Sequence, residues 1–356
     1  MPKPGLIIIG GNPFGVGAAL EAPEAFADTV EAHSGLMLEL EAPKSSVALG
    51  EPVVVELKLK LTDLRGKQVH PHLHPNQGAV QIGIRKPGGQ VMVYEPLMEA
   101  CMADETVTLD GDKPALYDSA YLGYGKDGFY FDQVGTYHIR AAYYALDGSE
   151  VMSNVMSLRV RAPHTAEDED VAELFLGDDQ GALLYLMGSD SDALRRGNEA
   201  FDEVLDKHRD PPLAVYARLI KGMNEAREFK TLNEDKREMT ARKPQLTESH
   251  ELLAAVVDVS EKGKGIDNIT LSQTMRKLAE IQKAAGDEKG SKETMRHMVE
   301  VWSGYTLVDR LTPGKPANSR GQTNEQTEDA PRMLTIREDV RQWSPGAKRR
   351  CPTRST

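Results

Sequence analysis

The amino-acid sequence predicts a multidomain protein in which an antiparallel β-sandwich is followed by an all-α region. Hydrophobic and polar residues alternate in short runs as far as Pro163, which is typical of strands that bury one face. Beyond Pro163 the hydrophobic spacing changes to that of amphipathic helices. The length of 356 residues is also enough for two domains of ordinary size.

The first predicted strands show regular alternation. Their core-facing residues are expected to be Leu36, Leu38 and Leu40 in the first; Val55, Leu57, Leu59 and Leu61 in the second; and Val80, Ile82 and Ile84 in the third. The turn at residues 86–89 contains a proline and two glycines, which predicts a hairpin with Val91 and Val93 in its second strand. A further short strand is predicted over 106–109.

The most informative pattern precedes the strand that runs from Tyr137 to Ala145. Asp132, Gly135 and Tyr137 form D-x-x-G-x-Y, which resembles the tyrosine corner of immunoglobulin-like sandwiches. The resemblance covers residues 35–163 and implies that the Tyr137 hydroxyl bonds to backbone upstream. It implies a fold and not a function, because this fold carries many unrelated functions.

The second region begins with a helix start at Thr165, which is a good N-cap and is followed by acidic residues. Helical hydrophobic spacing then recurs over 171–187 with a break near Gly177, and over 193–205, 213–223, 252–259, 271–285 and 292–302. The polar stretch from Asn233 to Thr247 is predicted to be a loop or a frayed helix.

The segment 278–302 is similar to the second half of a tetratricopeptide unit. It consists of two helical patterns joined by an Ala-Gly-Asp turn at 285–287, with Met295 and Met298 expected to face inward. Gly290 and Ser291 stand where that family favours alanine, and no 34-residue period recurs. The resemblance implies α-helical hairpin repeats, and an irregular helical bundle is the alternative.

We therefore expect four segments. These are a poorly ordered leader at 1–33, an immunoglobulin-like sandwich at 35–163, a tetratricopeptide-like helical domain at 164–305 and a disordered tail at 306–356. The glycines of the leader match no phosphate-binding motif. The tail is poor in apolar residues, which is typical of disordered chain.

Charge and hydropathy limit the partners and the location. The formal net charge of −12 argues against nucleic-acid binding, which requires a basic surface. No apolar run is long enough for a membrane helix, so a soluble protein is expected. No signal peptide is recognisable, so the location is cytoplasmic for the chain as written and extracytoplasmic if the N-terminus is incomplete.

One candidate metal site is present in the sequence. His70, His72 and His74 would point the same way in an extended segment, and three imidazoles can bind zinc or copper. Pro71 and Pro75 favour the alternative of an irregular polar loop between strands. Apart from this site, no cofactor is expected.

A cluster of aromatic residues provides the candidate binding surface. Tyr121, Tyr124, Phe129 and Tyr130 lie in a segment that we expect to be a long loop on the sandwich. Exposed rings could stack on a sugar or contact a protein partner, whereas the alternative is a loop that buries them. No catalytic motif was found, and no catalytic residue is assigned.

These features favour a non-enzymatic protein-binding or scaffold role. A helical array of this kind presents a surface to a protein or peptide partner. The alternative is an accessory portion of a secreted or surface enzyme, with metal or glycan binding on the sandwich. An enzyme of unrecognised type is a further alternative.

Overall fold

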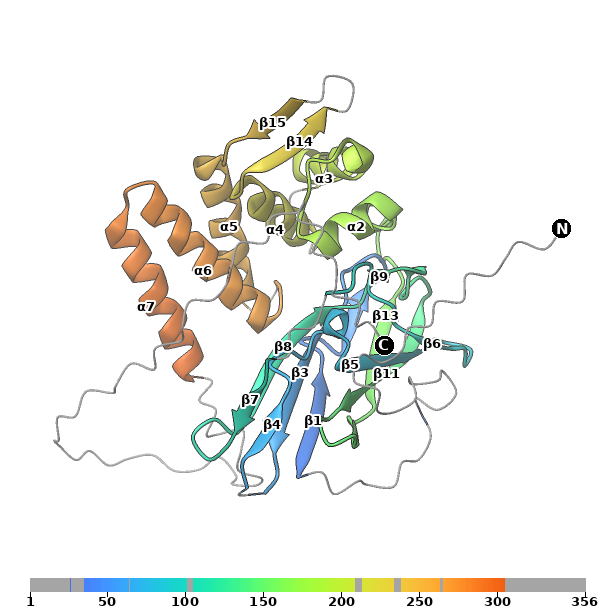
Figure 1. The fold of residues 1–356 in the computed structure, drawn as a ribbon. Helices are drawn as coiled ribbons and strands as arrows, with labels where there is room; N and C mark the ends of the chain where they lie inside the picture. The colour runs from blue at the N-terminus through green and yellow to red at the C-terminus, as the bar shows by residue number, and fades with distance from the viewer. Residues whose placement is uncertain are drawn as a thin grey trace, which may run out of the picture. The chain divides into compact units, whose positions relative to one another are not determined.

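The computed structural model describes residues 26, 35–63, 65–100, 105–208, 213–233, 238–262 and 265–304. The chain divides into one compact unit at 1–300 and a second unit at 301–356. All strands and nearly all helical residues described here belong to the first unit (Figure 1). The predicted disordered tail lies outside the described residues, as does the predicted leader except for Phe26.

Two larger sheets occupy the first part of the chain. The strands of the first sheet, in spatial order, are β1 (Leu36–Glu41), β3 (Val54–Leu61) and β8 (Ala115–Tyr121). Those of the second are β2 (Ser46–Ala48), β13 (Met156–Arg161), β11 (Gly135–Tyr144), β5 (Val80–Arg85) and β6 (Val91–Val93), with β12 (Glu150–Met152) paired to β11. Every pairing is antiparallel except that of β13 with β2.

Residues from both sheets contribute to one hydrophobic core. Leu38, Leu57 and Leu59 of the first sheet are buried together with Ile82 and Ile139 of the second. The predicted alternation is confirmed in β1, β3 and β5, because their core-facing residues are buried, except for the partly buried Leu61, while most intervening residues are more exposed. A period of two is therefore sufficient to assign the two faces of these strands.

The predicted tyrosine-corner geometry is present at the start of β11. The Tyr137 hydroxyl bonds to the backbone of Gln133, and Lys86 donates a hydrogen bond to the Asp132 carboxylate at 2.8 Å. Gly135 has a φ of +144°, and a Cβ there would lie 2.6 Å from the Pro87 ring. Only glycine tolerates both this positive φ and this close approach to Pro87 without a shift of the chain.

The aromatic segment between β6 and β11 differs from the prediction. The expected aromatic loop contains β8, which pairs with β3 along its full length, and two short strands, β9 (Tyr124–Gly125) and β10 (Gly128–Phe129). A further pair is formed by β4 (Lys67–Val69) and β7 (Val107–Leu109). Strand β8 was missed because Asp118 and Ser119 interrupt its hydrophobic alternation.

The helices follow in chain order. They are α1 (Ala166–Phe175), α2 (Asp178–Leu186), α3 (Arg195–Lys207), α4 (Ala214–Glu225), α5 (Leu246–Glu261), α6 (Asn268–Ala284) and α7 (Glu288–Gly304). Two 3-10 turns are also present, η2 (Pro75–Gln77) and η3 (Asp192–Leu194). The helix start at Thr165 is confirmed, because its hydroxyl accepts from the Asp168 N–H while the Asp168 carboxylate accepts from the Thr165 N–H.

The second region is not all-α. A hairpin of β14 (Phe229–Asn233) and β15 (Glu238–Arg242) is inserted between α4 and α5, where a loop or frayed helix was expected. Polar strands of this kind carry no apolar alternation, so the sequence pattern did not indicate them. Met298 is buried as predicted, whereas Met295 is 36% exposed.

Helix α2 joins the two regions within the compact unit. It packs on β9 and β10, and a Cβ at Gly181 would lie 2.3 Å from the Tyr124 ring. The Tyr185 hydroxyl, from the same helix, donates to the Met98 carbonyl at 3.0 Å. No helix of the described part of the chain is long and apolar enough to cross a membrane.

Candidate functional site

The three histidines of the predicted metal site have different surroundings. His70 is buried, and its backbone N–H donates to the Tyr143 hydroxyl at 3.1 Å. Burial lowers the pKa of His70. His74 caps η2 by accepting from the Asn76 N–H at 3.2 Å, and His72 is exposed.

The extended geometry assumed for these histidines is interrupted because β4 ends at Val69 and η2 begins at Pro75. Among the residues that the structure describes, no group of three or more His, Cys, Asp or Glu side chains could hold a metal ion. Zinc or copper binding by His70, His72 and His74 therefore stays a prediction without support from the geometry. Metal analysis of the purified chain beside its triple alanine variant would test it.

The predicted aromatic surface is largely an internal contact. Tyr130 is fully buried, and its hydroxyl accepts from the Glu95 N–H at 3.0 Å, so this residue is corrected to a core position. Tyr124 packs edge-on against Phe129, with ring centroids 5.0 Å apart, and its hydroxyl donates to Asp178 at 3.3 Å. Tyr121 is partly buried at the end of β8.

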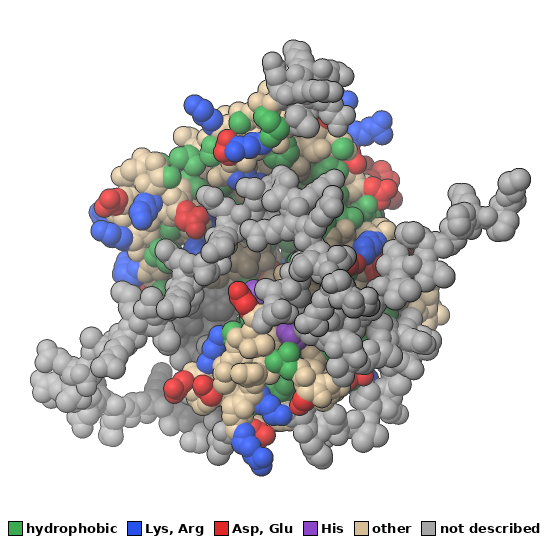
Figure 2. All heavy atoms as spheres, in the orientation of Figure 1, with side chains coloured by type: hydrophobic (Ala, Val, Ile, Leu, Met, Phe, Trp, Pro, Cys, Tyr) green, Lys and Arg blue, Asp and Glu red, His purple; other side chains and the backbone are tan. Residues whose placement is uncertain are grey.

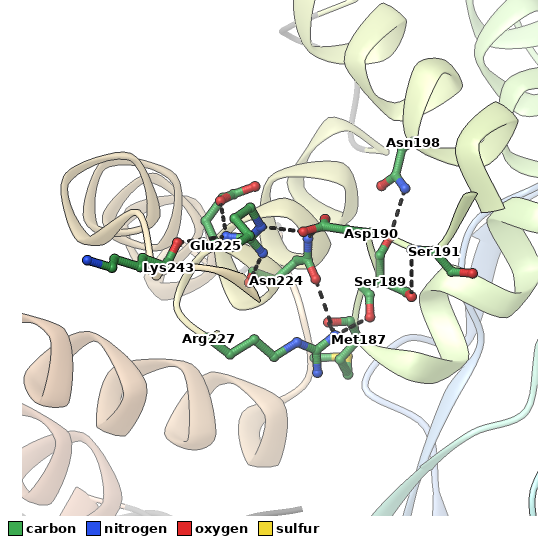
Figure 3. Close-up of polar contacts among 11 residues, drawn as sticks. Met187, Ser189, Asp190, Ser191, Asn198, Asn224, Glu225, Arg227 and Lys243 are labelled. Carbon is green, nitrogen blue, oxygen red and sulfur yellow. Dashed lines mark hydrogen bonds and ion pairs between the residues drawn. The ribbon is translucent and has the colours of Figure 1, made fainter. Parts of the chain in front are cut away.

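A polar network at the end of α4 is the strongest candidate site in the described chain (Figure 3). Its centre is Arg242 on β15, which reaches partners at the end of α4 and in the loop after α2. It pairs with Asp190, donates to the Glu225 carboxylate at 2.6 Å and donates to the Asn224 carbonyl at 2.9 Å. One guanidinium thereby ties the hairpin to α4 and to the loop after α2.

Asn224 forms the second link of this network. It is 4% exposed, and its side-chain amide donates to the Asp190 carboxylate. Asp190 thus receives hydrogen bonds from Arg242 and Asn224 on its two oxygens. A buried polar network with satisfied partners fixes the relative positions of the elements that contribute to it.

The loop after α2 is held against α4 by its backbone. Met187 adopts a left-handed conformation with φ +53°, and Gly188 follows with φ +93°. Arg227 donates to the carbonyls of both residues. A Cβ at Gly188 would lie 2.6 Å from the Asn224 Cβ, so this close approach requires glycine.

A hollow of about 270 Å³ opens beside this network. Its acidic lining residues are Asp190, Asp192, Glu199, Asp202 and Glu225, and its basic ones are Arg195 and Lys221. Lys221 pairs with Asp202, Arg195 lies 3.9 Å from Glu199, and Arg242 compensates Asp190 and Glu225 from one side. Carboxylates therefore outnumber cations around the opening, and the local potential favours a positively charged ligand.

Among the carboxylates that line this hollow, Glu225 has a largely buried side chain and a shifted pKa. Burial raises its pKa, while the Arg242 guanidinium acts in the opposite direction. Its side chain is 14% exposed. The arrangement suits charge recognition rather than proton transfer, because Glu225 and Asp190 are both engaged by Arg242.

The sequence pattern did not indicate this site. Asn224 follows the predicted apolar stripe of a helix, and Arg242 lies in the predicted loop, 52 residues from Asp190. Neither residue belongs to a short motif with a mechanism. The one available indication was an arginine in a polar segment between two helices, which is too common to be specific.

No family model matches this chain, and no curated protein matches it. Among solved structures, the CARDB domain of the PF1109 protein from Pyrococcus furiosus is 16% identical, with 35% of this chain and 86% of that chain covered, at a TM-score of 0.21. Spo0M, a sporulation control protein from Bacillus subtilis, is 11% identical, with 40% and 54% covered, at 0.23.

The alkylpurine DNA glycosylase AlkC from Pseudomonas fluorescens is 14% identical to this chain, with 36% of this chain and 31% of that chain covered, at a TM-score of 0.23. This chain thus spans about a third of the glycosylase and about half of Spo0M. At such TM-scores none of these likenesses carries an argument about function.

Proposed function

We propose that this chain is a non-enzymatic binding protein. In this proposal an immunoglobulin-like sandwich supports a helical region, and the acidic hollow at the end of α4 receives a basic side chain of a protein or peptide partner. The observation that carries the proposal is the excess of carboxylates around a preorganised hollow. The tyrosine corner and the core shared by two sheets support the sandwich assignment.

The network gives the hollow a fixed shape before any ligand arrives. Arg242, Asn224 and Arg227 hold the loop, the helix end and the hairpin together by hydrogen bonds. A preorganised site loses less conformational entropy on binding than a mobile one. Asp192 and Glu199 are exposed at the opening, where Glu199 also lies 3.9 Å from Arg195, and in this proposal both carboxylates meet the incoming cation.

On the face shown in Figure 2, the described lysine and arginine side chains are interspersed with acidic ones, and no basic patch gathers there. This distribution agrees with the net charge of −12. It gives no support on that face to a nucleic-acid partner, which would need positive charge to displace counterions. A partner with basic side chains is the better electrostatic match.

The test is a titration of the isotope-labelled full chain with N-acetyl-arginine amide. The backbone NMR spectrum is recorded at each addition. We expect shift changes that concentrate at Asp192 in η3, at Glu199 in α3 and at Glu225 at the end of α4, and none with the uncharged citrulline analogue. Asp192→Asn with Glu199→Gln should weaken the response several-fold, because two of the lining charges are removed.

The matched control is Asp110→Asn with Asp112→Asn, which removes two charges from an exposed turn outside the hollow. This control should bind the arginine probe like the wild type. Equal weakening in both double variants, or shift changes spread evenly over the surface acids, would show general attraction to an acidic protein and overturn the proposal.

A further inference from the structure

Phe26 stands apart in the N-terminal part of the chain because the structure places it against a sheet. Its ring is half-buried, and the Arg85 guanidinium lies 4.2 Å from the ring centroid. This distance is within the range of a cation–π interaction. Phe26 also joins a small apolar cluster that is separate from the main core.

The cluster lies on the outer face of the second sheet. Its centre is Ala142, against which Phe26, Val91, Tyr144 and Met152 pack. In β11, Ile139, Ala141 and Tyr143 face the main core, so Ala142 and Tyr144 lie on the opposite side.

Strand register places the other members of the cluster on the same outer face. Met152 pairs with Ala142, and Val91 pairs with Arg85. Arg85 in turn pairs with His138, which alternates with the core-facing Ile139. Figure 1 shows β5, β6 and β11 side by side in this sheet.

Burial shows that this outer face is covered. Ala142 is 0% exposed although its side chain points away from the main core. An apolar patch on the outer face of a sheet is costly in water unless another group packs on it. Phe26 is the aromatic member of the cluster that comes from outside the β region.

The charges of the two partners also support the assignment of the segment around Phe26 to this outer face. The segment 21–31 contains Glu21, Glu24, Asp28 and Glu31, and no lysine or arginine. The outer face carries Arg85, and also Arg140, which alternates with the core-facing Ile139 and Ala141. An acidic segment with a central aromatic residue is therefore complementary to this surface in charge and in hydrophobicity.

We propose that the outer face of β5, β6, β11 and β12 is a recognition surface for an acidic peptide with an aromatic anchor, and that residues 21–31 are its intramolecular ligand, anchored by Phe26. Because the segment is tethered, its effective concentration at the surface is high, in the millimolar range for short flexible links. A competing partner must present the same chemistry and bind more tightly. The inference is independent of the acidic hollow, which lies in the helical region.

The first experiment measures binding in trans by fluorescence anisotropy, with a labelled peptide of residues 20–33 as the probe. The full chain with Phe26→Ala should bind this peptide, because its own anchor no longer fills the patch. The wild-type chain should bind at least tenfold more weakly, since the tethered segment competes. A peptide carrying the same Phe26→Ala change is the control and should not bind.

Arg85→Ala in the Phe26→Ala background should weaken peptide binding several-fold by removing the cation above the ring. Equal binding of the peptide to the wild type and to Phe26→Ala would overturn the tethered arrangement. Absence of binding to a Phe26→Ala chain that unfolds cooperatively would overturn the recognition surface.

A second experiment covers the case in which Phe26→Ala does not fold. Phe26→Trp is made in a chain whose two tryptophans, Trp302 and Trp343, are replaced by phenylalanine. Its emission should be shifted to the blue, as for a half-buried indole, and should move to the red on Met152→Asp. Emission of a fully exposed indole before that change would overturn the proposal.

Discussion

The hydroxyl of Tyr137 donates a hydrogen bond to the Gln133 carbonyl at 3.0 Å and accepts one from the Gln133 N–H at 2.9 Å. Tyr137 is fully buried, and its ring packs against Phe131 with centroids 4.9 Å apart. One side chain therefore satisfies both backbone groups of a residue at the corner that leads into β11. This contact connects a sequence pattern directly to a stabilising interaction.

We expect Tyr137→Phe to destabilise the chain by about 1–3 kcal/mol, because it leaves two backbone groups without their partner while the ring stays in place. Unfolding in urea, followed by circular dichroism, measures this loss. Tyr117→Phe is the control, since Tyr117 is 44% exposed, and it should change the free energy of unfolding by less than about 0.5 kcal/mol. Similar small losses in both variants would argue against a stabilising corner.

The Arg242 and Asp190 side chains should be energetically coupled. In a double-mutant cycle with Arg242→Met and Asp190→Asn, we expect a coupling energy of about 1–3 kcal/mol, because the two groups share a partly buried network. The control cycle uses Arg296→Met and Glu300→Gln, an exposed pair on α7 with side chains 67% and 57% accessible. That pair should couple by about 0.5 kcal/mol or less. Additive effects at Arg242 and Asp190 would contradict the network.

Gly188 should be far less tolerant of alanine than Gly286. Both glycines have positive φ angles, +93° and +88°, so the backbone strain of the substitution is matched. Only at Gly188 does the added Cβ meet other atoms, 2.8 Å from the Ile220 carbonyl, whereas Gly286 has nothing within 4 Å. We expect Gly188→Ala to lower stability by about 1–3 kcal/mol more than Gly286→Ala. Thermal unfolding of the two variants gives the comparison.

The stability of the chain should depend on pH through the titration of Asp267. Asp267 is 3% exposed, lines a cavity of about 20 Å³ with Glu51 and Tyr216, and caps α6 by accepting from the Thr270 N–H at 2.9 Å. Burial raises the pKa of Asp267 despite this hydrogen bonding. The folded chain therefore binds the proton more tightly than the unfolded chain, and stability is lost as pH rises from the usual carboxyl pKa to the raised one.

Asp267→Asn should keep the cap, because asparagine caps helices as well as aspartate does, and should remove the ionisation. The stability of the wild type relative to this variant should fall as pH rises through that window. Asp267→Ala loses the cap and should be less stable than Asp267→Asn by about 1 kcal/mol at every pH. Urea unfolding across the pH range measures both, and a difference between wild type and Asp267→Asn that does not change with pH would contradict the shifted titration.

Local patterns predicted much of the fold. The alternation in β1, β3 and β5 and the cap at Thr165 depend on neighbouring residues only, so they could be recognised in the sequence. Strand β8 and the β14–β15 hairpin were missed because their residues carry no clear alternation. They form strands because a partner strand supplies the hydrogen bonds, which is a tertiary condition.

The candidate sites show the same difference between what local sequence patterns indicate and what tertiary contacts decide. The histidines and aromatic residues were conspicuous in the sequence, yet Tyr130 is a core residue and His72 and His74 have separate surroundings. Conspicuous residue types indicate chemistry only if the chain brings them to one place. The network of Arg242, Asn224 and Asp190 had no motif, and its members meet only because α4 and the hairpin pack beside the loop after α2.

The sequence by itself determined which face of β1, β3, β5 and β11 is buried, where α1 begins and which tyrosine closes the corner before β11, because each depends on the spacing of residues close in the chain. Only the tertiary structure decided that Arg242 meets Asp190 and that Phe26 packs under Arg85. Such contacts join residues far apart in sequence. Their partners are selected by shape, charge and burial, which no local period encodes.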